Sequence, residues 1–290
     1  MKSLRLSVYI LALVLTGKLD AASYVVLQGS ADHSLVRVSA DGKSVTTIAR
    51  GVEGVSLTVD GEGNFLVVSH STLSRVTPGG EVTALAHAPE GSIWVSVAVD
   101  RSGAILIADG MLPAVWKLSA NGSFIKKLKY DGVTLGPGGY RRASLLMGAG
   151  NDCMLLIQGI GVGLASVAQF FRIQPDGTVS EIPIKGPKTM YPDALTSDGS
   201  GNYFFVNEMN DGLPTQAIMQ LSADGTVQKF ADVPFGGAPV RMARNPETGE
   251  LAVSNEFPER LLLVRPDGFA VTTLAERPRV TQPVAVIEVP

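Results

Sequence analysis

Residues 198–207 read Asp-Gly-Ser-Gly-Asn-Tyr-Phe-Phe-Val-Asn, and residues 223–227 read Ala-Asp-Gly-Thr-Val. In the first stretch a Gly-containing turn precedes an apolar strand, and in the second a turn leads into a Thr- and Val-rich strand. Asp and Asn side chains hydrogen-bond to nearby backbone while Gly adopts positive φ, so both stretches predict β-hairpin turns. Together they predict one small antiparallel sheet.

Both kinds of turn recur along the chain at a spacing of roughly 40 residues, and self-similarity at this period, built from strands, is typical of a β-propeller. The turns of the second kind are Ala40-Asp41-Gly42, Pro78-Gly79-Gly80, Ala120-Asn121-Gly122, Pro175-Asp176-Gly177, Ala223-Asp224-Gly225 and Pro266-Asp267-Gly268. Those of the first kind span residues 60–64, 100–103, 148–151, 198–202 and 245–249, and each precedes an apolar strand. The pattern therefore predicts six repeats.

The first repeat lacks the first kind of turn, because it starts directly at the apolar run Tyr24-Val25-Val26-Leu27. The C-terminal run Val284–Val289 is a strand with nothing after it to pair with. We expect this strand to complete the first blade, which removes an exposed sheet edge. The predicted fold is an all-β, six-bladed β-propeller of four-stranded antiparallel blades, closed by pairing the C-terminal strand with the first blade. Residues 23–290 are expected to form this single domain.

Residues 1–22 have the layout of a secretory signal peptide. Lys2 and Arg5 precede an apolar run that ends at Leu15, and the small residues Ala21 and Ala22 follow. A run of about ten apolar residues is too short to span a bilayer permanently. We expect an exported protein, periplasmic or secreted, with no membrane attachment after cleavage; a retained membrane anchor is the alternative.

The composition limits the partners and the chemistry. Hydrophobic residues make up 45% of the chain and charged residues 18%, as expected of a well-buried globular protein. The formal net charge of -3 provides no basic excess for a phosphate backbone, so nucleic acid is not an expected partner. Cys153 is the one cysteine and lies in an apolar run, which favours a buried packing thiol over a nucleophile. We expect a monomer.

Polar residues are predicted to gather around one mouth of the central channel. The innermost strand of a blade starts at the face to which the second strand returns, so strand starts and second-strand ends converge there. Carboxylate and amide oxygens at one mouth would suit a hard cation such as calcium. The residues expected to contact a ligand at this mouth are Asp109, Tyr140, Arg142, Tyr191, Glu208, Arg241 and Glu256.

The D-x-x-G-N turns with their apolar strands, followed by P-D-G turns and Thr/Val strands, resemble the NHL-repeat and the gluconolactonase/regucalcin-like six-bladed propellers over residues 23–290. The gluconolactonase-like resemblance implies a metal-ligating Asp after a Pro at an inner-strand start, which Asp193 matches. It also implies a Glu at an early inner-strand start, for which Glu53 and Glu90 both qualify. The implied calcium or zinc site is thus Asp193, Glu53 or Glu90, and Asn207.

The sequence departs from that family at two places. Arg142 stands where the family has an Asn at the start of the preceding inner strand, and Ala194 replaces the usual Gly. An Arg in the mouth would compete with a cation for the carboxylates. Salt bridges or a solvated channel mouth are therefore the alternative interpretation of these charges.

Two functions are compatible with these residues. The first is an exported propeller that binds a small molecule or a protein partner at the channel mouth, with no catalytic residues assigned and no certain cofactor. The second is a divalent-metal-dependent lactone or ester hydrolase, in which calcium or zinc polarises the carbonyl and a carboxylate activates water. A lyase resembling virginiamycin B lyase is disfavoured, because that family has an additional blade and its catalytic His has no match here.

Overall fold

The computed structural model describes residues 23–29, 33–131, 140–148, 151–160, 168–186, 192–207, 217–232, 239–245, 248–255, 260–265, 267, 271–276, 280 and 283–289. The expected signal peptide, residues 1–22, lies outside these ranges. Within them, no helix has the length and hydropathy that crossing a membrane requires.

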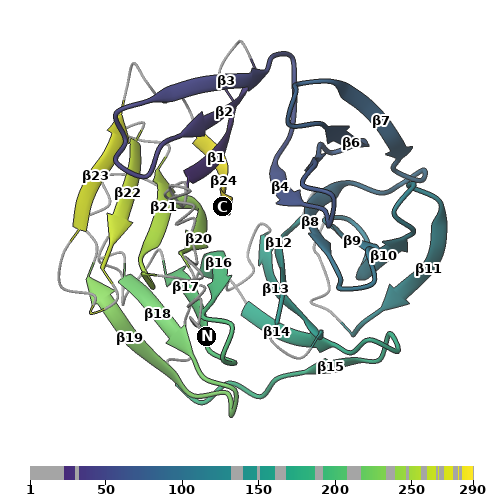
Figure 1. The fold of residues 1–290 in the computed structure, drawn as a ribbon. Helices are drawn as coiled ribbons and strands as arrows, with labels where there is room; N and C mark the ends of the chain where they lie inside the picture. The colour runs from purple at the N-terminus through teal and green to yellow at the C-terminus, as the bar shows by residue number, and fades with distance from the viewer. Residues whose placement is uncertain are drawn as a thin grey trace, which may run out of the picture.

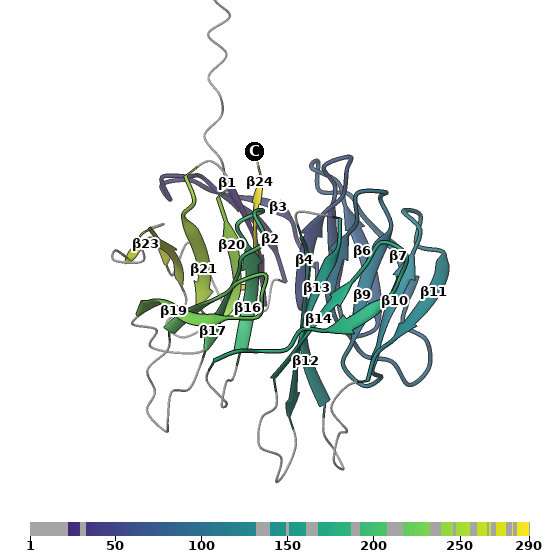
Figure 2. The ribbon, with the colours of Figure 1, turned by 90° about the horizontal axis from the view of Figure 1, so that it is seen from below.

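Six four-stranded antiparallel sheets form a ring around a central channel (Figure 1), and the inner strands run between its two faces (Figure 2). We number the sheets as blades 1 to 6. Blade 1 has the order β24-β1-β2-β3, from the channel to the rim, with β24 at Pro283–Val289, β1 at Ser23–Gln28, β2 at Leu35–Val38 and β3 at Val45–Ala49. Blade 2 contains β4 (Ser56–Val59), β5 (Phe65–Val68), β6 (Thr72–Val76) and β7 (Val82–His87). Blade 3 contains β8 (Trp94–Val99), β9 (Ile105–Asp109), β10 (Ala114–Leu118) and β11 (Phe124–Lys129).

The remaining three blades repeat this order from the channel to the rim. Blade 4 contains β12 (Tyr140–Met147), β13 (Cys153–Ile160), β14 (Ala168–Ile173) and β15 (Val179–Glu181). Blade 5 contains β16 (Pro192–Ser197), β17 (Tyr203–Asn207), β18 (Ala217–Leu221) and β19 (Val227–Asp232). Blade 6 contains β20 (Pro239–Arg244), β21 (Leu251–Asn255), β22 (Arg260–Val264) and β23 (Val271–Glu276).

The C-terminal strand closes the ring. β24 pairs antiparallel with β1, with Tyr24 opposite Glu288 and Val26 opposite Val286. All six residues of β1 are buried, since β1 lies between β24 and β2 within its sheet. The predicted fold class and its closure are therefore confirmed.

The turns have the predicted side-chain support. The Asp198 Oδ1 accepts hydrogen bonds from the backbone N–H groups of Ser200 and Asn202 at 2.7 and 3.1 Å, and Gly201 has a φ of 100°. Burial opposes ionisation of this carboxyl, but the hydrogen bonds from Asn202 and Ser200 outweigh it and hold the pKa of Asp198 below its ordinary value. The repeated Asp thus fixes the path between the first two strands.

The hydrophobic core lies between neighbouring blades as six clusters. In the cluster between blades 3 and 4, Leu128 and Leu155 contribute side chains from the two sheets. Cys153 belongs to this cluster, and its burial raises the pKa of its thiol to about 12. It is therefore protonated at neutral pH and has the packing role that the sequence predicts.

Glycine in the second kind of turn has a further role that links consecutive blades. A Cβ placed on Gly80, in the β6–β7 turn of blade 2, would overlap the backbone carbonyl oxygen of Ile48 in blade 1. The turn glycines Gly42, Gly122 and Gly225 likewise approach backbone carbonyls of the preceding blade. The turn that reverses the chain therefore also packs closely against the preceding blade.

Gly80→Ala is expected to destabilise the protein more than Gly63→Ala. Both positions have positive φ, 89° and 82°, but a Cβ at Gly63 meets nothing within 4 Å. The steric overlap at Gly80 should add about 1–3 kcal/mol to the cost. Thermal and urea unfolding of both variants measures the difference. Equal losses in the two variants would show that the contact with Ile48 does not constrain the ring.

Candidate functional site

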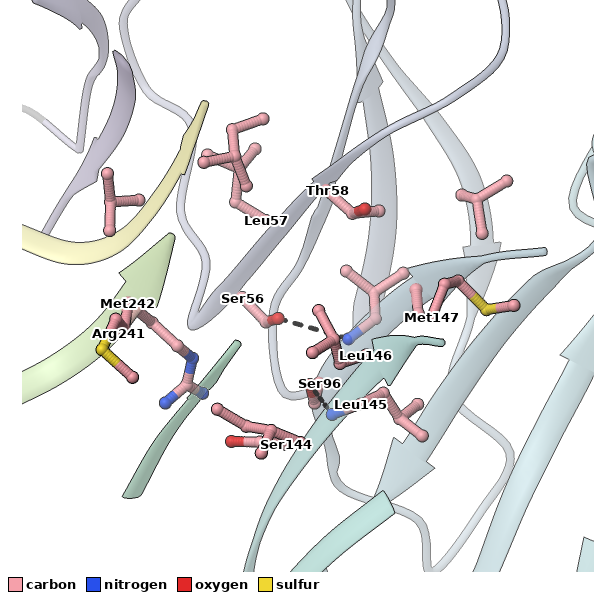
Figure 3. Close-up of a pocket in the computed structure, with 16 residues that line it drawn as sticks. Ser56, Leu57, Thr58, Ser96, Ser144, Leu145, Leu146, Met147, Arg241 and Met242 are labelled. Atoms are coloured by element: carbon pink, nitrogen blue, oxygen red, sulfur yellow. Dashed lines mark hydrogen bonds between the residues drawn. The ribbon is translucent and has the colours of Figure 1, made fainter. Parts of the chain in front are cut away.

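A cavity of about 250 Å³ lies in the channel, lined by residues of all six innermost strands (Figure 3). These strands have no strand partner on the channel side, so their edges present backbone groups to the interior. The residues that line the cavity are Ser56, Leu57, Thr58, Ser96, Val97, Ala98, Val99, Ser144, Leu145, Leu146, Met147, Leu195, Arg241, Met242, Val286 and Ile287.

Serine hydroxyls satisfy some of these edge groups from one blade to the next (Figure 3). The Ser56 Oγ accepts a hydrogen bond from the Val97 N–H at 3.2 Å, and the Ser96 Oγ accepts one from the Leu145 N–H at 2.9 Å. Buried backbone groups need such partners. Ser144 occupies the corresponding place in blade 4, one residue before Leu145. Its hydroxyl has no hydrogen-bond partner within the part of the chain that the structure describes.

Arg241 is a cationic group in the channel. A β-bulge between Pro239 and Arg241 interrupts the pairing at the start of β20. The backbone N–H of Arg241 donates to the Ser254 Oγ at 3.0 Å, and the Ser254 hydroxyl donates to the Arg241 carbonyl at 3.1 Å. The Arg241 Nη2 donates to the Val55 carbonyl of blade 2 at 3.3 Å. The side chain therefore reaches from blade 6 past blade 1.

The mouth end of blade 5 has an irregular backbone. Pro192 pairs with Asn207 and Asp193 with Val206, after which the register shifts up to Thr196. Ala194, inside this bulge, is fully buried and has a φ of 55°. That left-handed conformation is strained for Ala, whereas Gly adopts it freely. Bulges and residues with strained φ are enriched near functional sites.

The structure places the expected metal ligands as follows. Asp193 is the second residue of β16, although its side chain lies outside what the structure describes, and Asn207 is buried at the end of β17. Glu53 and Glu90 are both exposed, in the segments that precede β4 and β8. No group of three or more His, Cys, Asp or Glu side chains gathers within the described ranges.

Of the expected ligand-contact residues, the structure shows some at the cavity and some away from it, and others lie outside the described residues. Arg142 lies in β12 and is exposed, whereas Arg241 lines the cavity. Tyr140 begins β12, and its side chain is not among those described. Tyr191, Glu208 and Glu256 lie outside the described residues.

Asp109 is fully buried and supports the surrounding chain. Its Oδ1 accepts hydrogen bonds from the backbone N–H groups of Met111 and Leu112 at 2.8 and 2.9 Å, and a longer one from Ile93 at 3.3 Å. Its Oδ2 accepts a hydrogen bond from the Trp116 Nε1 at 2.9 Å. The carboxylate thus ties the end of β9 to β10 and to the approach to β8.

A buried polar group beside Asp109 was missed by the sequence reasoning. Arg141, only 4% exposed, donates from Nη1 to the Met111 carbonyl at 2.8 Å. Burial raises the pKa of the Tyr130 hydroxyl; the Arg141 charge opposes this rise, and the Asp109 charge adds to it. The pair Arg141-Arg142 could have indicated this buried group. Side chains of consecutive residues in a strand point to opposite sides, so the two arginines cannot both face the same way.

A second cavity, of about 280 Å³, lies at the turns of blades 2 to 4. Its two carboxylates already have cationic partners. Asp60 pairs with Arg75 at 3.3 Å and Asp100 with Lys117 at 3.0 Å. The channel cavity is therefore the better candidate site.

Comparison with known proteins supports the fold. No family model matches the sequence, and no curated protein matches it. A structure from a nidogen/laminin complex matches with a TM-score of 0.69 and 11% identity, over 92% of this chain and 98% of that one. A streptogramin B lyase structure matches with a TM-score of 0.60 and 14% identity, over 92% and 87% of the two chains.

A third match is a protein from Bacteroides fragilis NCTC 9343 whose proposed activity is that of a 6-phosphogluconolactonase. Its TM-score is 0.61 and its identity 11%, over 93% of this chain and 99% of that one. At these identities the similarity shows the propeller fold alone. The fold's neighbours thus include a protein from a protein–protein complex and proteins named as enzymes.

Asp109→Asn is expected to destabilise the protein by about 1–3 kcal/mol, because an amide cannot accept hydrogen bonds on both sides. Its NH₂ group must face either the backbone amides or the Trp116 Nε1–H. Trp116→Phe removes the indole donor, so Asp109→Asn should cost less in that background. Unfolding of the two single variants and the double variant measures this coupling. Strictly additive losses would contradict a direct Asp109–Trp116 interaction.

Proposed function

We propose that the protein is an exported propeller that binds a small molecule in its central channel. The observation that carries this proposal is the cavity of about 250 Å³, into which hydroxyl groups and the Arg241 side chain converge. Concave sites with mostly apolar walls and a few placed polar groups are typical of small-molecule binding. The signal-peptide layout of residues 1–22 supports export.

A protein partner at the channel mouth is a related possibility within the same class. The nidogen/laminin structure is a propeller relative in a protein complex. The channel cavity favours the small molecule, because its volume of about 250 Å³ and its concave wall of side chains suit a small ligand.

A metal-dependent lactone or ester hydrolase is the second candidate, and the bulge at the start of β16 favours it. Asp193 pairs with Val206, the residue before the buried Asn207, at the edge of this bulge. An Asp after a Pro at an inner-strand start is what the gluconolactonase-like resemblance implies for a metal ligand. A divalent cation held there would polarise a carbonyl group.

The described side chains do not complete such a metal site. Glu53 and Glu90 are exposed, and no group of three acidic, histidine or cysteine side chains gathers in the ranges that the structure covers. Calcium takes six to eight oxygen ligands. The binding role is therefore supported better than the hydrolase role.

One set of measurements on the mature chain, residues 23–290, separates the two functions. Thermal melting is recorded with a panel of neutral, cationic and anionic small organic compounds. Calcium and zinc are titrated by calorimetry, and hydrolysis of lactones and esters is assayed alongside. Ser144→Leu is the blocking variant, because its larger side chain should occupy the cavity while the hydroxyls of Ser56 and Ser96 stay in place. Asp193→Ala is the metal-site variant.

The binding proposal predicts that at least one compound raises the melting temperature of the wild type and has no such effect on a folded Ser144→Leu variant. Equal stabilisation of both proteins, or no stabilisation by any compound, would contradict binding in the channel. Calcium or zinc binding that disappears in Asp193→Ala, together with lactone or ester hydrolysis, would establish the hydrolase instead.

A further inference from the structure

We propose that the outer edge of blade 3 is a docking site for an extended acidic segment of a partner protein, which adds a strand to β11. We call Phe124, Ile125, Lys127 and Lys129 the rim site. It lies at the rim of the ring, four strands out from the channel (Figure 1). The inference is therefore independent of ligand binding in the channel.

β11 has an open edge. It is the outermost strand of blade 3, and in the described chain β10 is its one strand partner. Residues 126–129 pair in regular register with residues 114–117, and a β-bulge is confined to the start of the strand, between Phe124 and Lys126. The outer side of such a strand presents backbone N–H and C=O groups with which another extended chain can pair.

Two bulky apolar side chains are exposed on this strand. Phe124 is 47% exposed and Ile125 59% exposed. The Trp116 ring adjoins them, with its centroid 5.7 Å from that of Phe124 in an edge-to-face arrangement. A strand edge that is protected against association carries charges, and exposed apolar residues counteract that protection. Their exposure favours a surface that a partner covers.

β11 also concentrates positive charge. Its six residues include three lysines and no acidic residue, although the whole chain has a formal net charge of -3. Among the other five outer strands, β19 alone contains a lysine or arginine, and its Lys229 pairs with Asp232 at 2.8 Å. Complementary charge selects partners and speeds their association. The partner of the rim site is therefore expected to be acidic.

Two of these lysines form a row. Lys127 is opposite Trp116 and Lys129 is opposite Ala114, so both project from the Trp116 side of the sheet. The Lys127 Nζ lies 4.6 Å from the centre of the Trp116 ring. Neither lysine has a carboxylate partner in the part of the chain that the structure describes. Their spacing of two residues matches that of alternate carboxylates on an extended peptide.

An extended acidic peptide suits the rim site better than a second copy of the chain does. Antiparallel pairing of β11 with another β11 over all six residues would place Lys126 opposite Lys127. Like charges directly opposite across two strands are destabilising. A polyanion without a peptide backbone would contact the lysines but leave the strand edge unpaired. A peptide uses the edge, the lysines and the apolar side chains together.

The test uses fluorescently labelled peptides and the mature chain, residues 23–290. The parent peptide alternates Glu and Val over about eight residues, enough to span β11. One control peptide has Gln in place of every Glu. A second has an N-methyl group on every residue, which keeps the charge but removes the backbone donors. Fluorescence polarisation measures each dissociation constant.

The protein variants are Lys127→Glu/Lys129→Glu and a charge-matched control, Lys43→Glu/Lys229→Glu, whose two lysines are exposed and lie outside the rim site. The parent peptide is expected to bind the wild type with a dissociation constant on the order of 100 µM or below. Both control peptides should bind at least about tenfold more weakly. Lys127→Glu/Lys129→Glu should lose about tenfold in affinity for the parent peptide, and the control variant less than about twofold.

Melting curves establish that each variant is folded; if Lys127→Glu/Lys129→Glu is not, Lys129→Glu and its control Lys229→Glu decide the question. Absence of binding to the wild type, or an equal loss in the two double variants, would overturn the proposal. A Gln peptide that binds as tightly as the parent would overturn the acidic partner. An N-methylated peptide that does so would show a polyanion site without strand pairing. Sedimentation of the wild type as a dimer, lost in Ile125→Asp, would show that a second copy occupies the edge.

Discussion

The hydrogen-bonded pairing of β24 with β1 is the constraint on which the rest of the molecule depends. It joins the two ends of the propeller chain, and it supplies blade 1 with the strand that faces the channel. The same strand contributes Val286 and Ile287 to the cavity wall. Closure of the ring and formation of the candidate site are therefore one event, because a sheet of only three strands would leave both an open edge and an incomplete wall.

Within the closed ring, each blade contacts its neighbour in two places, one near the rim and one at the channel. Near the rim, turn glycines such as Gly80 approach carbonyls of the preceding blade. At the channel, Ser56 and Ser96 bond backbone amides of the following blade. This series ends at Ser144, and the next inner strand, β16, begins with the bulge that contains Ala194. The departure from regular packing thus lies beside the cavity, which Ser144 and Leu195 both line.

The repeated turns were sufficient to predict the fold, because turn residues such as Asp198 act locally and their hydrogen bonds depend on positions two to four residues away. The channel position of Arg241 was also predictable from strand direction alone. The bonding of Asp109 was not, since it requires the exact approach of β8, β9 and β10. The serine series was overlooked, although Val55-Ser56-Leu57, Val95-Ser96-Val97 and Ala143-Ser144-Leu145 show it as a Ser at the same place in three consecutive repeats.

The most direct test of this account is the thermal unfolding of a chain that ends at residue 282, measured alone and with the peptide of residues 283–290 added in trans. The account predicts that the shortened chain loses its cooperative transition and that the peptide restores it, because β24 provides the inner strand of blade 1. A shortened chain that melts as the full chain does, with no response to the peptide, would contradict the claim that this strand closes the ring.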